Sequence, residues 1–308
     1  MTWFFVTIIS YALFAVAAVG DRYLLSGPIP DQKLYTFYIG VLGMAVFLFT
    51  PFLGISFIGF EPFTVALFAG IAFGGGLFFF FYGLERFEAS RVVPAIGGLL
   101  PLVTLIFSVL FFRETRAFGV SEIGAFILLV SGSVLITRDK KGENSKISFS
   151  VALAASFLFG LSFVLTKYVF LIAPFWSAFA WTRAGVFLVA ATLFAFSGGL
   201  RWALFHSPHS SSPSRARTSI LFLGNQAVGA GAGLLQNAAI FLAPPLYLSF
   251  INALQGAQYV FVLVFTAFLS FKFPAVLREE FAKRVLLRKI FATLIIVLGI
   301  LILAFTTE

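Results

Sequence analysis

The sequence predicts an all-α integral membrane protein with ten transmembrane helices, arranged as two inverted five-helix repeats. Three observations support this fold class. The chain is 60 % hydrophobic and 11 % charged, with a mean hydropathy of +1.04, whereas soluble domains are about 25 % charged. Its apolar residues fall into ten stretches of the length that crosses a bilayer. Short matches recur in the same order in the two halves, which indicates an internal repeat.

Each predicted span follows from the roughly 20 apolar residues that a bilayer core requires. The ten spans lie near residues 2–20, 34–53, 63–83, 92–112, 118–137, 149–170, 174–196, 218–241, 245–270 and 287–306. The first stretch has no basic n-region and no small-residue cleavage motif, so we expect it to be retained as a span. Most connections are short, which makes consecutive spans antiparallel neighbours.

The repeat predicts two units, residues 1–140 and 147–308. Aligning residues 6–23 with 151–168 pairs Phe14 with Phe159, and LFAG at 67–70 aligns with LFLG at 221–224. Because five is odd, the second unit enters the membrane from the opposite side. We therefore expect a cavity near the midplane that opens alternately to each side. Chance similarity among apolar helices is the alternative.

Orientation follows from the basic residues, most of which lie in the loops after spans one, three, five, seven and nine. The positive-inside rule places these loops in the cytoplasm and both termini outside. We also expect a short basic helix at 273–289 on an anionic membrane surface, and a loop without chemistry at 206–219.

Composition disfavours several classes of function. The chain has no cysteine, and its two histidines, His206 and His209, lie in a Ser/Pro-rich stretch. We therefore expect no metal and no cofactor. The net charge of +9 comes from basic residues at span ends, so it indicates orientation and not nucleic-acid binding. A membrane-embedded enzyme is a remote alternative, because no nucleophile with its base lies at membrane depth.

Polar side chains inside lipid are costly and normally face the bundle interior. The eighth span carries two amide pairs on either side of the stretch AVGAGAG: Asn225, Gln226, Gln236 and Asn237. Residues eleven positions apart share a helical face, so this span is a candidate floor for a substrate chamber. The alternative is helix packing, because Gly229 and Gly233 form a GxxxG pair.

The ninth span continues the polar pattern with Asn252, Gln255, Gln258 and Tyr259 at helical spacing. We expect these side chains to line the cavity, with helix packing as the alternative. Its repeat partner, span four, instead carries Pro94 and Pro101, which lie on one face and supply a backbone that can kink or gate.

Arg183 is the only basic residue well within a predicted span. Three alternatives stay open for it: binding a substrate carboxylate, pairing with a glutamate, or snorkelling to the surface. Tyr82 and Trp181 combine a ring with a polar handle and are candidates for stacking on a substrate. Carboxylates are weak candidates for proton coupling, because Glu85 and Glu114 end their spans and Asp21 is expected to form a surface pair with Arg22.

Residues 74–114 carry a resemblance to a known family. An aromatic, a small residue, leucine and a charge at 82–85 are followed by Ala89-Ser90 and by a proline-bearing apolar span that ends at Glu114. This layout resembles the EamA-like family of ten-helix carriers in the drug/metabolite transporter superfamily. The resemblance implies export of amino acids, related metabolites or drugs. It also implies cytoplasmic termini, which the charge distribution contradicts, and an arginine in the second and seventh helices, which only Arg183 matches.

Together these observations predict a carrier in the cell (inner) membrane that moves small polar or amphipathic metabolites, such as amino acids, by alternating access. We expect a small-molecule substrate and membrane lipids as partners, with no nucleic acid and with monomer or homodimer left open. The runner-up function is a lipid-linked sugar or nucleoside-type transporter of the same superfamily.

Overall fold

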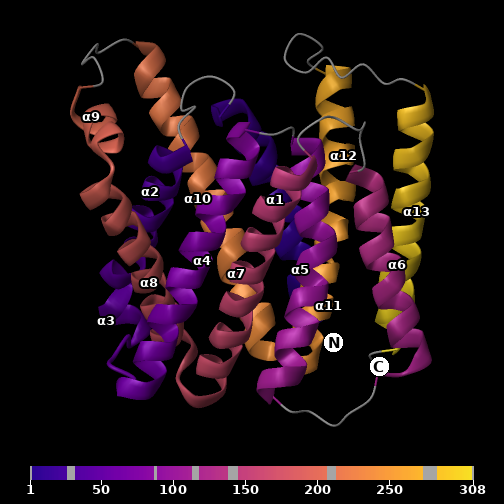
Figure 1. The fold of residues 1–308 in the computed structure, drawn as a ribbon, viewed down its shortest axis with the longest axis horizontal. Helices are drawn as coiled ribbons and strands as arrows, with labels where there is room; N and C mark the ends of the chain where they lie inside the picture. The colour runs from indigo at the N-terminus through magenta and orange to yellow at the C-terminus, as the bar shows by residue number, and fades with distance from the viewer. Residues whose placement is uncertain are drawn as a thin grey trace.

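The computed structural model describes residues 2–25, 32–86, 89–112, 118–137, 145–206, 213–272 and 283–306. These residues form helices joined by short turns, and none of them lies in a β-strand. The helices run roughly parallel in one bundle, and both chain termini lie at the same end of it (Figure 1). The predicted all-α fold is therefore confirmed.

The helices of the first half are α1 (Thr2–Leu25), α2 (Gln32–Gly43), α3 (Thr50–Leu53), α4 (Phe60–Arg86), α5 (Ala89–Phe112) and α6 (Val120–Thr137). Those of the second half are α7 (Ser145–Ile172), α8 (Phe175–Phe196), α9 (Gly198–His206), α10 (Pro213–Leu242), α11 (Leu248–Ala253), α12 (Gln255–Lys272) and α13 (Lys283–Thr306). Two 3₁₀ segments are also present: η1 (Met44–Phe49) lies between α2 and α3, and η2 (Pro245–Tyr247) lies between α10 and α11.

Six helical stretches among the described residues are long and apolar enough to cross a membrane: Thr2–Asp21, Gln32–Leu53, Phe60–Gly83, Ala95–Phe112, Phe149–Ile172 and Phe175–Phe196. Two shorter apolar helices cover Val120–Leu135 and Ile290–Leu303. The chain is thus a multi-pass membrane protein, as its hydropathy predicts. The count of ten spans and the inverted repeat stay predictions.

Several elements differ in detail from the expected spans. The second span is divided, because α2 gives way to η1 at Met44. The ninth is also divided, since the helix breaks at Leu254 between α11 and α12. In contrast, α5 continues without a break through Pro94 and Pro101. The expected loop at 206–219 is shorter than predicted, because α10 already begins at Pro213, and a proline suits the first helical turn.

The expected surface helix at 273–289 is described only in part. Residues 273–282 lie outside the described residues, and residues 283–289 form the first turns of α13.

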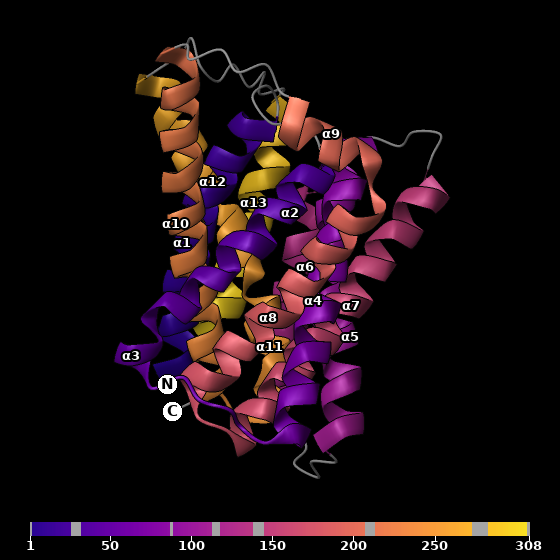
Figure 2. The same ribbon diagram turned by 90° about the vertical axis from the view of Figure 1, so that its left-hand side faces the viewer.

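The helices pack in a defined set of pairs. Helix α1 contacts α10 and α12, α4 contacts α7 and α8, α5 contacts α7 and α11, α6 contacts α13, and α2 contacts α8. From the side, α10 lies along one flank of the bundle (Figure 2). A close backbone approach joins α4 and α8, where a Cβ on Gly185 would lie 2.8 Å from the Cα of Gly70. Only glycine permits this contact at either position.

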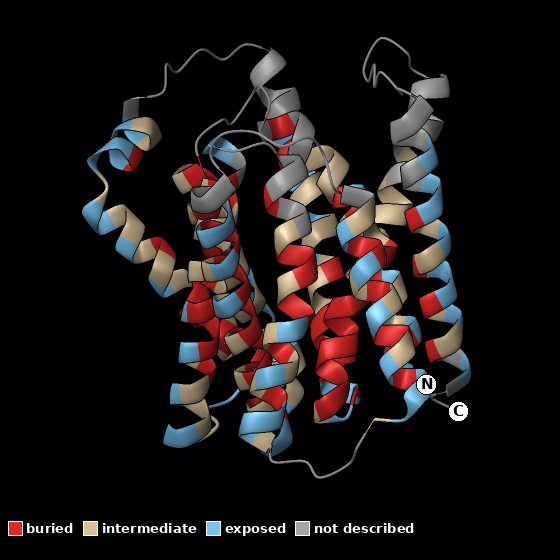
Figure 3. Cartoon of the chain, turned by 45° about the vertical axis from the view of Figure 1, so that its right-hand side comes forward, coloured by how far each residue is buried: buried red, intermediate tan, exposed pale blue. Residues whose placement is uncertain are grey.

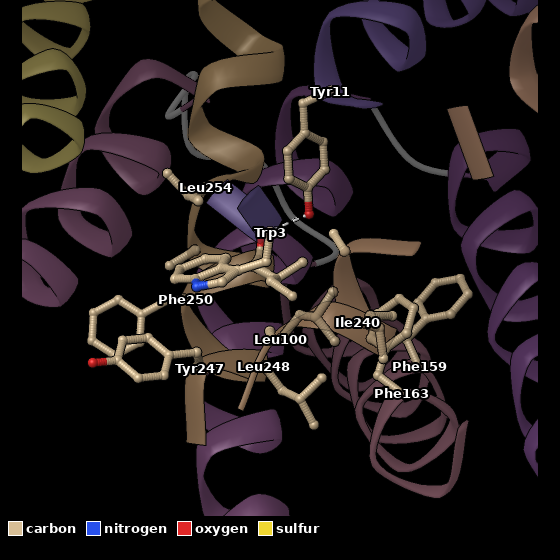
Figure 4. Close-up of a cluster of buried hydrophobic side chains, with 14 of the residues drawn as sticks. Trp3, Tyr11, Leu100, Phe159, Phe163, Ile240, Tyr247, Leu248, Phe250 and Leu254 are labelled. Carbon is tan, nitrogen blue, oxygen red and sulfur yellow. Dashed lines mark hydrogen bonds between the residues drawn. The ribbon is translucent and has the colours of Figure 1, made fainter. Parts of the chain in front are cut away.

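Buried side chains lie on the helix faces that turn toward one another, and exposed ones line the outer faces (Figure 3). Large apolar side chains are exposed there, among them Phe52, Phe60 and Phe196, which suits contact with lipid. The buried cluster includes Trp3, whose ring lies 5.3 Å from that of Tyr247 (Figure 4). Phe250 of α11 packs on Tyr247 as well, so the start of α1 is held against the α11 region.

Candidate functional site

A first polar cluster joins α1, α2 and α10. Asp21, near the end of α1, accepts a hydrogen bond from the hydroxyl of Tyr35 and another, at 2.6 Å, from Nδ2 of Asn225. Gln226 donates to the Tyr35 hydroxyl at 3.0 Å. Tyr35 is fully buried and Asp21 is half-buried. Two of the predicted amides therefore surround a half-buried carboxylate. The side chain of Arg22, with which a surface pair is expected, lies outside the described residues.

Glycine at position 20 makes this cluster possible. A Cβ at Gly20 would lie 2.6 Å from the Cγ of Asn225, so any larger residue would displace the amide from Asp21. The sequence contains the Gly20-Asp21 pair, but its position next to Arg22 suggested a solvated charge. The missing information was the partner helix, which begins more than 190 residues later.

A second polar group surrounds the break between α11 and α12. The Tyr11 hydroxyl donates to the carbonyl of Ile251 at 2.9 Å (Figure 4), and Gln236 donates to the Tyr11 hydroxyl at 3.4 Å. Ile251 lies among the last four residues of α11, whose carbonyl groups have no partner within their own helix. Tyr11 of α1 thus bonds to a backbone carbonyl that the break exposes, and Gln236 of α10 bonds to the Tyr11 hydroxyl.

The amides of the ninth span connect α11 and α12 to the first half of the chain. Asn252 donates to the Thr104 hydroxyl of α5 at 2.9 Å, and Gln258 donates to the Phe14 carbonyl of α1 at 3.4 Å. The oxygens Asn252 Oδ1 and Gln255 Oε1 are buried, and neither has a hydrogen-bond partner within the described part of the chain. A buried acceptor without a donor is costly, so both oxygens are candidates to receive a donor from a bound solute.

Tyr259, one turn further along α12, lies over α5. A Cβ on Gly97 would be 2.8 Å from the Tyr259 hydroxyl, so glycine at this position gives the ring room. The contacts of Tyr259, Asn252 and Gln258 thus place the polar face of the ninth span inside the bundle, against α1 and α5.

Arg183 is the ninth residue of the 22-residue helix α8. Its guanidinium lies 4.9 Å from the ring centre of Phe179 and 5.2 Å from that of Phe73 on α4. The described residues offer it no hydrogen bond and no ion pair, and Nε is buried without a partner. Cation–π contacts recover about 0.5–2 kcal/mol each, whereas removing a charge from water costs several kcal/mol. The two rings therefore compensate this cation only in part.

The two aromatic candidates for stacking on a substrate, Trp181 and Tyr82, make contacts away from the amides. Trp181 packs edge-on against Phe47 and Phe63 and donates to the Ser56 carbonyl at 3.0 Å, so it braces the turn before α4. Tyr82 stacks on Phe78 and lies under the Arg86 guanidinium at 4.4 Å, at the other end of α4. Neither is brought together with the amides by a described contact.

Helix packing does not explain the glycines of α10. A Cβ at Gly233 would meet no described atom within 4 Å, and one at Gly229 would meet only the Cβ of Ala17 at 3.9 Å. The GxxxG pair therefore makes no close helix contact here. Asn237 donates to the Gly233 carbonyl of its own helix at 2.8 Å, so its amide stays close to this glycine stretch.

Glu122 is a buried carboxylate that the sequence reasoning missed. It is 4 % exposed, accepts from the Gly119 amide at 2.8 Å, and accepts from the Tyr247 hydroxyl. As the third residue of α6, it occupies the position from which an acidic side chain reaches back to the helix start. That spacing before an apolar run is a signal which could have identified it.

Comparisons with known proteins identify a shared fold. No protein-family model matches the chain, and no curated protein matches it. A solved crystal structure, described only as that of a protein, is similar over 99 % of this chain and 96 % of its own, with a TM-score of 0.64. The two sequences are 16 % identical, so the similarity shows the fold alone.

Proposed function

We propose that the protein is a carrier that moves small polar or amphipathic metabolites, such as amino acids, across the cell membrane by alternating access. The observation that carries this proposal is the set of helix contacts. Replacing each helix by its equivalent in the other half reproduces most of these contacts. The expected repeat makes α7 equivalent to α1, α8 to α2, α10 to α4, α11 with α12 to α5, and α13 to α6.

Under this equivalence, most contacts occur twice or map onto themselves. The contact of α1 with α10 corresponds to that of α7 with α4, and α1 with α12 corresponds to α7 with α5. The pairs α2–α8, α5–α11 and α6–α13 each map onto themselves. This pattern is the one expected for two inverted units that share an interface, and it supports the predicted units 1–140 and 147–308.

Some contacts break the pattern, such as those of α4 with α8 and with α2, whose equivalents α10–α2 and α10–α8 are not among the main helix pairs of the described residues. The contact of α4 with α8 supports a two-state mechanism. Helices α4 and α8 touch at Gly70 and Gly185, and the repeat makes Gly224 of α10 and Gly40 of α2 their equivalents. A Cβ at Gly224 would meet no described atom within 4 Å, whereas Gly40 lies against Ala190 of α8. We infer that one glycine contact is closed and its equivalent is open, and that transport exchanges them.

The substrate class follows from the interior side chains. Amides on α10, α11 and α12 offer hydrogen bonds, and buried oxygens of Asn252 and Gln255 lack donors among the described residues. An amino group is a donor that would satisfy such oxygens. The resemblance to the EamA-like family supports export, and the basic loops support a cytoplasmic location of the end opposite the termini.

Transport by purified protein in liposomes tests this proposal. Liposomes are loaded with radiolabelled neutral and aromatic amino acids, and efflux is compared for wild type, Gln255→Ala and Thr192→Ala. Thr192 is the control, because it is exposed and its hydroxyl bonds to its own helix. We expect saturable efflux, reduced roughly tenfold in Gln255→Ala by loss of one hydrogen bond to substrate, and unchanged in Thr192→Ala. Efflux of nucleosides or lipid-linked sugars alone would refute the amino-acid substrate.

A further inference from the structure

Arg183 carries a positive charge at a place where the described residues supply no negative charge. It lies near the middle of α8, with Nε buried and unpaired. Its side chain also approaches α2, where a Cβ on Gly43 would lie 3.6 Å from its Cδ. The Arg183 side chain therefore lies between α2, α4 and α8.

The position distinguishes among the explanations for an arginine inside a span. Pairing with a glutamate is not seen in the described part of the chain. Snorkelling would take the guanidinium along its own helix toward water, but it is held between two helices, over Phe179 of α8 and Phe73 of α4. Phe73 in turn packs on Phe159 and Phe163 of α7, so the guanidinium faces the bundle interior.

The N–H groups of the Arg183 guanidinium that have no partner among the described residues define what it would bind. Nε is fully buried, and the two terminal nitrogens, which have no hydrogen bond to a described residue, are not fully buried. Two parallel N–H groups of a guanidinium match the two oxygens of a carboxylate. The rings of Phe73 and Phe179 border this fork and offer apolar surface beside it.

We propose that Arg183 binds the carboxylate of the transported solute and so selects solutes with a carboxylate over neutral solutes of the same shape. This inference rests on the proposed carrier function and assigns its substrate class. An inorganic anion such as chloride shares the required charge, so the experiment must separate the two sources.

Binding by the purified protein tests the inference without transport. The probes are 3-phenylpropanoate and 3-phenylpropanamide, which share ring and chain and differ in the carboxylate. Binding is measured by titration and thermal shift for wild type, Arg183→Met, Arg183→Lys and the control Arg201→Met, in methanesulfonate buffer with and without chloride. Arg201 is an exposed residue of α9 and provides a matched charge removal.

We expect wild type to bind the carboxylate roughly 10- to 100-fold more tightly than the amide, the range of a charge-assisted hydrogen-bond pair. Arg183→Met loses this preference, Arg183→Lys retains part of it, and Arg201→Met retains all of it. Without ligand, Arg183→Met melts no lower than wild type, because it removes an uncompensated charge. If Arg183 served only to stabilise the fold, Arg183→Met would melt at a lower temperature than wild type.

Three results would overturn the assignment: equal binding of the two probes, an unchanged preference in Arg183→Met, or no detectable binding of the carboxylate. Stabilisation by chloride that needs Arg183, with no effect of 3-phenylpropanoate, would assign the site to an inorganic anion. A retained carboxylate preference in a protein that transports no solute would refute the carrier proposal and leave the anion site standing.

Discussion

Single side chains in this bundle act mainly as links between helices from distant parts of the chain. Asp21, Tyr35 and Asn225 join α1, α2 and α10, and Tyr11 joins α1 to α11. Within a membrane no water is present to replace such bonds. The amides predicted from the sequence therefore serve two purposes: some hold helices together, whereas Asn252 and Gln255 keep oxygens without donors among the described residues.

The link at Tyr35 can be measured by a double-mutant cycle. Tyr35→Phe fills the same buried volume and removes only the hydroxyl, which bonds to Asp21 and accepts from Gln226. We expect each of Tyr35→Phe and Asp21→Asn to lower stability, with a coupling energy of about 1–2 kcal/mol between them. Thermal unfolding in detergent measures it. Tyr38→Phe is the control, and an additive cycle would show that the contact contributes nothing.

Residue roles are only partly predictable from this sequence. Spacing identifies Asn225, Gln226, Gln236, Asn252 and Gln258 as interior side chains, because a polar group in an apolar helix avoids lipid. Spacing does not identify their partners. The roles of Asp21 and Tyr11 emerge only from the packing of α1 against α10, which brings Asp21 to Asn225 and Tyr11 to Gln236.

At the scale of elements, the glycines divide into those that permit a contact and those that face open space. Helices α4 and α8 meet at Gly70 and Gly185, whereas Gly224 of α10 meets no described atom. Glycine thus permits the contact of α4 with α8, whereas the equivalent glycine of α10 makes no such contact with a described residue.

Alanine substitutions separate these two kinds of glycine. Gly70→Ala forces α4 away from α8, and we expect a loss of about 1–3 kcal/mol in stability from overpacking. Gly224→Ala has room for its methyl group and gains up to about 1 kcal/mol in helix propensity. Melting temperatures in one detergent provide the comparison. Equal loss at both positions would contradict the open environment of Gly224.

Hydropathy predicts most helices here because a membrane-spanning helix must satisfy its own backbone and present apolar side chains to lipid. It predicts neither η1 nor the break at Leu254. Next to the break, the Tyr11 hydroxyl bonds to the Ile251 carbonyl from the opposite end of the sequence. Pro94 and Pro101 lie within the continuous helix α5, and their role in a kink or gate stays a prediction.

For the whole molecule, the all-α class and the membrane location follow from composition and from the lengths of the apolar stretches. The repeat rests on weak sequence matches, to which the pattern of helix contacts adds independent support. Gly70 of α4 lies against α8, whereas its equivalent Gly224 of α10 meets no described atom. Under the proposed carrier mechanism, these two glycine contacts exchange during transport.

Labelling of Gly224→Cys tests this exchange, because the chain contains no cysteine to interfere. The introduced thiol is exposed to a membrane-impermeant maleimide in liposomes, with and without the transported solute. We expect labelling from one side of the membrane, at a rate that changes when solute drives the exchange of states. A rate independent of solute, or no labelling from either side, would show that α10 faces lipid at this position and would contradict alternating access at this contact.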